Sequence, residues 1–113
     1  NTGATPLFMA AQEGHNDTAT LLLAHGAAVD AAFNDGATPL FMSAQEGHND
    51  MAALLLAHGA AVDAADNGGA TPLSMAAHKG LSDMAALLLA HGAAVDAANN
   101  GGATPLFMAA QEG

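Results

Sequence analysis

The tripeptide Thr-Pro-Leu begins at residues 5, 38, 71 and 104, and so recurs at a constant interval of 33 residues. A fixed period in this range is typical of proteins built from stacked repeat units, each of which is one small supersecondary element. The sequence divides into units at residues 1–33, 34–66 and 67–99, followed by a partial unit at 100–113. Because such units bury their apolar faces against one another, we expect residues 1–113 to form a single domain.

Each Thr-Pro-Leu tripeptide has the chemistry of a helix start. The threonine hydroxyl can accept a backbone N–H of the first turn, and proline suits the first helical position, where no N–H donor is needed. Gly14 suits the left-handed residue that ends a helix, and Asn16, Asn49 and Ser82 are N-cap types that predict a second helix in each unit. We expect an all-α fold with helices at residues 5–13, 16–25, 38–46, 49–58, 71–79, 82–91 and 104–112.

The second helix of unit two is apolar on nearly every side, with Met51, Ala53 and the leucines of 54–56. A helix of this kind has to be covered by neighbours on more than one side, which favours the stacking of units. In unit one, Thr18 and Thr20 stand in place of Met51 and Ala53. We therefore interpret the first unit as a partial cap with a more polar face.

The charge of the chain limits its partners. The chain has 1 basic and 11 acidic residues, for a net charge of −10. Nucleic acids and anionic membrane surfaces are bound through several lysines or arginines, so we exclude both. No apolar run has the length of a membrane span, and the absence of cysteine rules out disulfides, thiol catalysis and zinc–thiolate sites. These features do not indicate a compartment, and we assume the cytoplasm by default.

No arrangement of polar residues in the sequence forms a recognisable active site. His25, His58 and His91 occupy one repeated position at the predicted end of the second helix, where an imidazole suits the negative end of the helix dipole. Equivalent residues of stacked units lie on the order of 10 Å apart, too far to share a metal ion or to form a catalytic carboxylate pair. We therefore predict no enzyme activity and no cofactor.

Carboxylates recur at the predicted turns. Asp30, Asp63 and Asp96 share one repeated position, and we interpret the polar residues of the turn segment 63–69, which begins at Asp63, as solvated turn residues. The turns lack the alternating acids and the distant glutamate of a calcium-binding loop. We expect no high-affinity metal site, and at most a loosely held Ca²⁺ at Asp35, Asp63 and Asp66.

Further motifs accompany the period. Gly-x-Thr-Pro-Leu is followed by Ala-Ala-x-x-Gly-His and then by Leu-Leu-Leu-x-x-Gly-Ala. At a spacing of 33 residues, this combination resembles the ankyrin repeat over the whole chain. The resemblance implies an ankyrin-repeat solenoid of stacked helix-turn-helix units, with a β-turn finger at each unit boundary and a concave face that binds proteins.

In the ankyrin family, the finger tips and the exposed face of the first helix line this concave surface. Carried over to this sequence, the resemblance implies partner-binding positions in all three complete units. They are Gln12, Glu13, Phe33, Asn34, Asp35, Ala37, Gln45, Glu46, Asp66, Asn67, Gly68, Ala70, His78 and Lys79. We expect Phe8 and Phe41, which lie beside this face, to pack between the repeats.

The sequence leaves two classes of function open. The first, which we take as the leading hypothesis, is a protein–protein interaction module whose partner presents a basic surface to Glu13, Glu46, Asp35 and Asp66. The second is a structural or self-associating segment of a longer repeat array with no separate ligand. The near-identity of the units favours the second class, because surfaces that select partners usually differ between units.

The partial unit also predicts self-association. It repeats the first helix of a unit without the second, which leaves apolar surface uncovered on the leucines of 87–89, Leu106 and Met108. Because unit one is more polar, head-to-tail stacking would bury only one apolar surface. We therefore predict a weak, salt-promoted two-fold homodimer through the C-terminal end.

Overall fold

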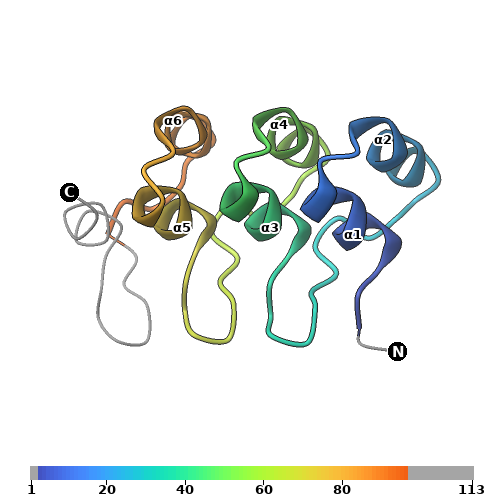
Figure 1. The fold of residues 1–113 in the computed structure, drawn as a ribbon, viewed down its shortest axis with the longest axis horizontal. Helices are drawn as coiled ribbons and strands as arrows, with labels where there is room; N and C mark the ends of the chain where they lie inside the picture. Colours follow the sequence, from blue (N-terminus) through green and yellow to red (C-terminus); the bar gives the residue numbers. More distant parts are fainter. Residues whose placement is uncertain (1–2, 97–113) are drawn as a thin grey trace.

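The computed structural model describes residues 3–96, which form three pairs of α-helices (Figure 1). The first helices of the units are α1 (Pro6–Glu13), α3 (Pro39–Glu46) and α5 (Pro72–His78). The second helices are α2 (Asn16–Ala24), α4 (Asn49–Ala57) and α6 (Ser82–Ala90). Each of these ends lies within one residue of its predicted position, and the all-α prediction is confirmed. The helix predicted at 104–112 lies outside the described residues.

The helices form two layers. The first helices lie side by side in one layer and the second helices in the other, while the loops at the unit boundaries project from the first layer, away from the second (Figure 1). One apolar core, which includes Leu7, Leu40, Leu55 and Leu88, runs through the three units. None of the described helices is long and apolar enough to cross a membrane.

The central helix α4 is covered from both sides, as its apolar sequence predicted. It packs against α3 in its own unit, against α2 before it and against α6 after it. Met51, Ala52 and Leu55 are fully buried, whereas Ala53 faces solvent. The buried residues thus lie on the faces that stack the units.

The threonine caps of the first helices are confirmed. The hydroxyl oxygens of Thr5, Thr38 and Thr71 each accept the backbone N–H of the third residue further on, at 3.1 Å. In unit three this acceptor belongs to a capping box, because the Ser74 hydroxyl in turn accepts the Thr71 N–H at 2.8 Å. A proline follows each threonine at the start of the helix.

The caps predicted for the second helices were wrong. Asn16, Asn49 and Ser82 are the first helical residues, and the N-cap positions are held by the residues before them, His15, His48 and Leu81, whose side chains form no capping bond. The reason is the shortness of the link: α1 ends at Glu13 and its C-cap is Gly14, which has a left-handed φ of 75°, so only His15 remains to start α2. The Asn16 Oδ1 is buried without a hydrogen-bond partner.

The loops at residues 33–37 and 66–70 are tight, hairpin-like turns, as predicted, and are called fingers below. In the first finger, Phe33 N–H donates to the Ala37 carbonyl at 2.8 Å and Gly36 N–H to the Phe33 carbonyl at 2.9 Å. The second finger repeats both bonds at 2.9 Å. Gly36 has a φ of 86°, which favours glycine at this position.

Candidate partner-binding surface

The predicted partner-binding residues lie on the fingers and at the C-terminal ends of the first helices, and most are accessible. The exposed positions are Glu13, Asn34, Asp35, Glu46, Asn67, Gly68 and Lys79. The half-buried positions are Gln12, Phe33, Gln45, Asp66, Ala70 and His78. Ala37 is the exception, because its side chain is 1% exposed and lies in the core.

Three charged residues form a row along the first-helix layer. Glu13, Glu46 and Lys79 occupy equivalent positions at the ends of α1, α3 and α5, which pack side by side. A carboxylate at a helix C-terminus adds to the negative end of the helix dipole, whereas a lysine offsets it. The row is therefore negative over units one and two and positive over unit three.

A small apolar cluster supports the first finger. The rings of Phe8 and Phe33 are stacked, with centroids 5.1 Å apart and planes 18° from parallel. Phe8 and Phe41 are both buried in this cluster, with Ala37 and Met42, which confirms the prediction that they pack between repeats. Phe33, predicted as a partner-binding residue, uses one ring face for this stacking and is half-buried.

The finger carboxylates shape the fingers. Asp35 Oδ1 accepts the Ala37 N–H at 3.0 Å, and Asp66 Oδ1 accepts the N–H groups of Gly68 and Ala70 at 2.9 and 3.0 Å. Within residues 3–96, no group of three or more His, Asp or Glu side chains could hold a metal ion. The loosely held Ca²⁺ at Asp35, Asp63 and Asp66 stays a prediction.

Consecutive fingers are bonded to each other. The Asn67 backbone N–H donates to the Asp35 carbonyl at 2.8 Å, and its side-chain amide donates to the Asn34 carbonyl at 3.2 Å. A Cβ at Gly36 would lie 2.6 Å from the Asn67 Oδ1, so only glycine permits this close approach. The finger tips therefore form one continuous edge along units two and three. Sequence analysis missed these bonds, because they join residues a full unit apart.

Four of the histidines make contacts that stabilise the fold. Nδ1 of His25, His58 and His91 lies 3.0–3.1 Å from the carbonyl oxygen four residues earlier, which confirms their prediction as helix C-terminal caps. In addition, His48 Nε2 lies 3.1 Å from the Gln12 carbonyl oxygen and joins unit two to unit one.

Asp30 and Asp63 are exposed turn residues, as predicted for Asp63, but both also have a role between units that was not predicted. Both Asp30 carboxylate oxygens lie 3.2 Å from the Ala61 nitrogen, and those of Asp63 lie 3.0 and 3.2 Å from the Ala94 nitrogen. Each carboxylate therefore accepts a backbone N–H of the next unit. No local sequence signal indicates this role.

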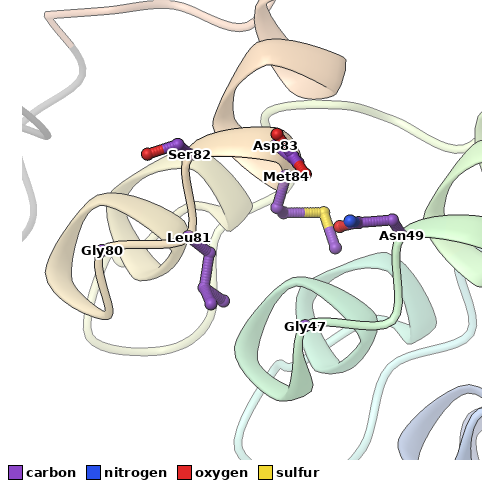
Figure 2. Close-up of a pocket in the computed structure, with 7 residues that line it drawn as sticks. All are labelled: Gly47, Asn49, Gly80, Leu81, Ser82, Asp83 and Met84. Atoms are coloured by element: carbon purple, nitrogen blue, oxygen red, sulfur yellow. The ribbon is translucent and has the colours of Figure 1, made fainter.

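Two equivalent open hollows, of about 300 and 340 Å³, lie where consecutive units meet at the starts of the second helices. In the hollow between units two and three, Leu81 and Met84 extend toward Gly47 and Asn49 (Figure 2). Every residue lining one hollow has its counterpart 33 residues away in the other. The hollows are therefore a product of the stacking, and they contain none of the predicted partner-binding residues.

Comparison with known families agrees with this geometry. A family profile described as ankyrin repeats (3 copies) matches residues 1–66, and one described as ankyrin repeats (many copies) matches residues 55–109. A search of curated proteins returned no significant match. Ankyrin repeats are generally protein–protein interaction modules, and the family is typically non-catalytic. On its helix pairs, its 33-residue period and these matches, the chain belongs to the ankyrin repeat family.

Proposed function

We propose that this chain is an interaction module that binds a protein partner on its concave face, formed by the fingers and the exposed ends of the first helices. The difference between units two and three carries this proposal. Residues 50–65 are identical to 83–98, so every difference between the two units falls at 34–49 or at residue 66. The constant part builds the second-helix layer, while the variable part contains the finger and the first helix.

The variable positions on this face change its charge. Asp35 of the first finger corresponds to Gly68 of the second, and Glu46 at the end of α3 corresponds to Lys79 after α5. Substitutions that alter charge on an exposed face, within an otherwise constant unit, are suited to discriminating between partners. This pattern supports an interaction module over a purely structural segment.

The partner that fits units one and two carries lysines or arginines. Glu13 and Glu46 are exposed at helix ends where the dipole disfavours a carboxylate, so a cationic group placed there relieves this repulsion. Asp35 and Asp66 use only Oδ1 in the bonds of their own fingers, which leaves Oδ2 to accept a bond from a partner. Because Lys79 is positively charged, we expect unit three to contact an acidic or neutral part of the partner.

Titration with labelled peptides rich in lysine and arginine tests this proposal. We expect the double variant E13Q/E46Q to bind such peptides more weakly than the unmodified chain, and we expect binding to weaken as salt is raised, because exposed charges are screened beyond about 8 Å at physiological ionic strength. The matched control is D17N/D50N, which removes the same charge from exposed positions on the second helices. Equal weakening by both double variants, or salt-independent binding, would contradict the concave-face proposal.

A further inference from the structure

The two ends of the described solenoid are complementary halves of a contact that the chain already makes twice internally. We propose that two copies of this chain associate head to tail, with unit one of one copy stacked on unit three of the other. This proposal is independent of the concave face, because it uses the surfaces by which units stack.

The face of unit one that corresponds to the face by which units two and three contact the preceding unit is called its front below. This front exposes residues whose counterparts are buried in the later units. Thr18 is exposed, whereas Met51 and Met84 at the same position are 0% exposed. Pro6 is also exposed, while its counterparts, Pro39 and Pro72, are fully buried. Beside Pro6 lies an apolar hollow of about 200 Å³, lined among others by Leu7, Leu22 and Ala27. The counterpart surfaces of units two and three are covered by the preceding unit.

The face of unit three that corresponds to the face by which units one and two contact the following unit is called its back below. It carries the other side of the contact between consecutive units. Leu89 is 44% exposed, whereas its counterparts Leu23 and Leu56, which face the following unit, are 9% exposed. Ala85 is half-buried, while its counterparts, Ala19 and Ala52, are 0% exposed. Unit three therefore has the apolar surface on which the second helix of a following unit would pack, and part of this surface is exposed.

A hydrogen bond is also open at both ends. The carboxylates of Asp30 and Asp63 each accept an N–H of the following unit, from Ala61 and Ala94. The next acceptor in this series is Asp96, which is exposed, and the counterpart of Ala61 in unit one is Ala28, also exposed. Stacking unit one of a second copy on unit three would join these two groups.

The sequence identifies a second copy as a fitting occupant. Residues 100–113 repeat residues 1–14 at every position but one, where Gly101 replaces Thr2. Any surface of unit three that fits residues 100–113 therefore fits residues 1–14 of a second copy. The second copy also brings α2, which residues 100–113 do not repeat. Residues 100–113 belong to the same chain, so in any competition for that surface they have the higher effective concentration, and we expect two copies to associate weakly.

The polarity of unit one does not prevent this contact. Two threonines suggested a polar cap. Thr20 corresponds to Ala53, which faces solvent in unit two, so a polar residue at this position does not affect stacking. Only Thr18 places a polar residue where the other units have a buried apolar one. Leu21, on the same helix, is 61% exposed, whereas its counterparts in units two and three are half-buried. Head-to-tail stacking thus buries apolar surface on both sides, whereas the predicted two-fold contact would use the C-terminal end alone.

The contact has a distinctive consequence for the size of the assembly. A head-to-tail contact uses different surfaces on the two copies, so each added copy presents a new free end and the assembly does not close. A two-fold contact between C-terminal ends stops at the dimer. The net charge of −10 opposes either contact, so both strengthen with added salt.

Substitutions at Thr18 test the proposal in opposite directions. Thr18→Met restores the residue buried in units two and three, and we expect it to tighten association about tenfold. Thr18→Glu places a charge in the contact, and we expect it to abolish association. Ala53→Glu makes the same charge change on the solvent-facing side of α4 and should leave the contact intact. Sedimentation of the full chain at high protein and salt concentration measures these effects, with circular dichroism confirming that each variant is folded.

Mixing two singly blocked variants distinguishes the two geometries. Thr18→Glu blocks the front face and Leu89→Glu blocks the back face, so we expect each variant to be monomeric alone and an equimolar mixture to form a dimer. If Thr18→Glu alone still dimerises while Leu89→Glu does not, the contact is the two-fold one and the head-to-tail proposal is wrong. A monomeric unmodified chain, or identical association of the Met and Glu variants at residue 18, would also overturn it.

Discussion

Both carboxylate oxygens of Asp30 lie 3.2 Å from the backbone nitrogen of Ala61, which is 31 residues further along the chain. Asp63 repeats the contact with Ala94. Ala61 and Ala94 directly follow the buried residues Ala60 and Ala93, so each bond ties the exposed rim of a unit boundary to its core. A single carboxylate thereby helps to set how consecutive units sit on each other.

Replacing Asp63 should therefore weaken the stacking of units two and three. We expect Asp63→Ala to lower the free energy of unfolding by about 0.5–1.5 kcal/mol, the usual net value of one intramolecular hydrogen bond. Asp96→Ala is the control, because Asp96 occupies the same repeated position without such a bond. Urea unfolding measures both, and an equal loss in the two variants would mean that the bond to Ala94 adds nothing.

Loss of a first-helix cap should have a clear cost. Thr38 is buried and its hydroxyl accepts the Phe41 N–H, so we expect Thr38→Ala to destabilise the chain by about 1 kcal/mol. Thr20 is an exposed threonine whose hydroxyl donates to the Asn16 carbonyl within a helix. Because alanine is the better helix former, Thr20→Ala should be neutral or stabilising. Thermal unfolding compares the two, and the reverse order would refute the capping argument.

Two glycines with similar backbone angles should differ in their tolerance of alanine. Gly14 and Gly80 have φ values of 75° and 70°, so a side chain at either position costs about 1–2 kcal/mol of backbone strain. A Cβ at Gly14 would in addition lie 2.9 Å from the His48 ring, whereas at Gly80 it would meet nothing within 4 Å. We expect Gly14→Ala to lower the urea midpoint more than Gly80→Ala does. Equal midpoints would show that the His48 ring moves away from the added Cβ without any loss of stability.

Leucines at two positions of the second helix should respond very differently to truncation. Leu55 is 0% exposed at the centre of the core, so Leu55→Ala should cost about 2–5 kcal/mol. Leu21 is mostly exposed, and Leu21→Ala should change the free energy of unfolding by less than about 0.5 kcal/mol in the monomer. Chemical unfolding at low protein concentration makes the comparison. A large loss at Leu21 would mean that the front of unit one is already covered in solution.

The sequence predicted local structure well and contacts between units poorly. Thr38 and Pro39 act within one turn of their own helix, so their roles follow from residue type and position. The stacking of Phe8 on Phe33 and the bond from Ala61 to Asp30 depend on how far each unit is shifted and turned relative to its neighbour, which no local pattern encodes. The accessibility of the candidate surface was predicted for most positions, and Ala37 was missed because it is buried in a cluster that includes Phe8 of the preceding unit.

The identity of residues 50–65 and 83–98 has a consequence for how the chain folds. Units two and three have the same second helix, so each offers a neighbouring unit the same docking surface. Side-chain complementarity therefore barely distinguishes the correct stacking order from one in which a whole unit is skipped. Looping out one unit costs entropy that grows only slowly with length. The order of units is then enforced mainly by the short fingers between them, and a skipped unit is the misfolded trap to which this chain is most exposed.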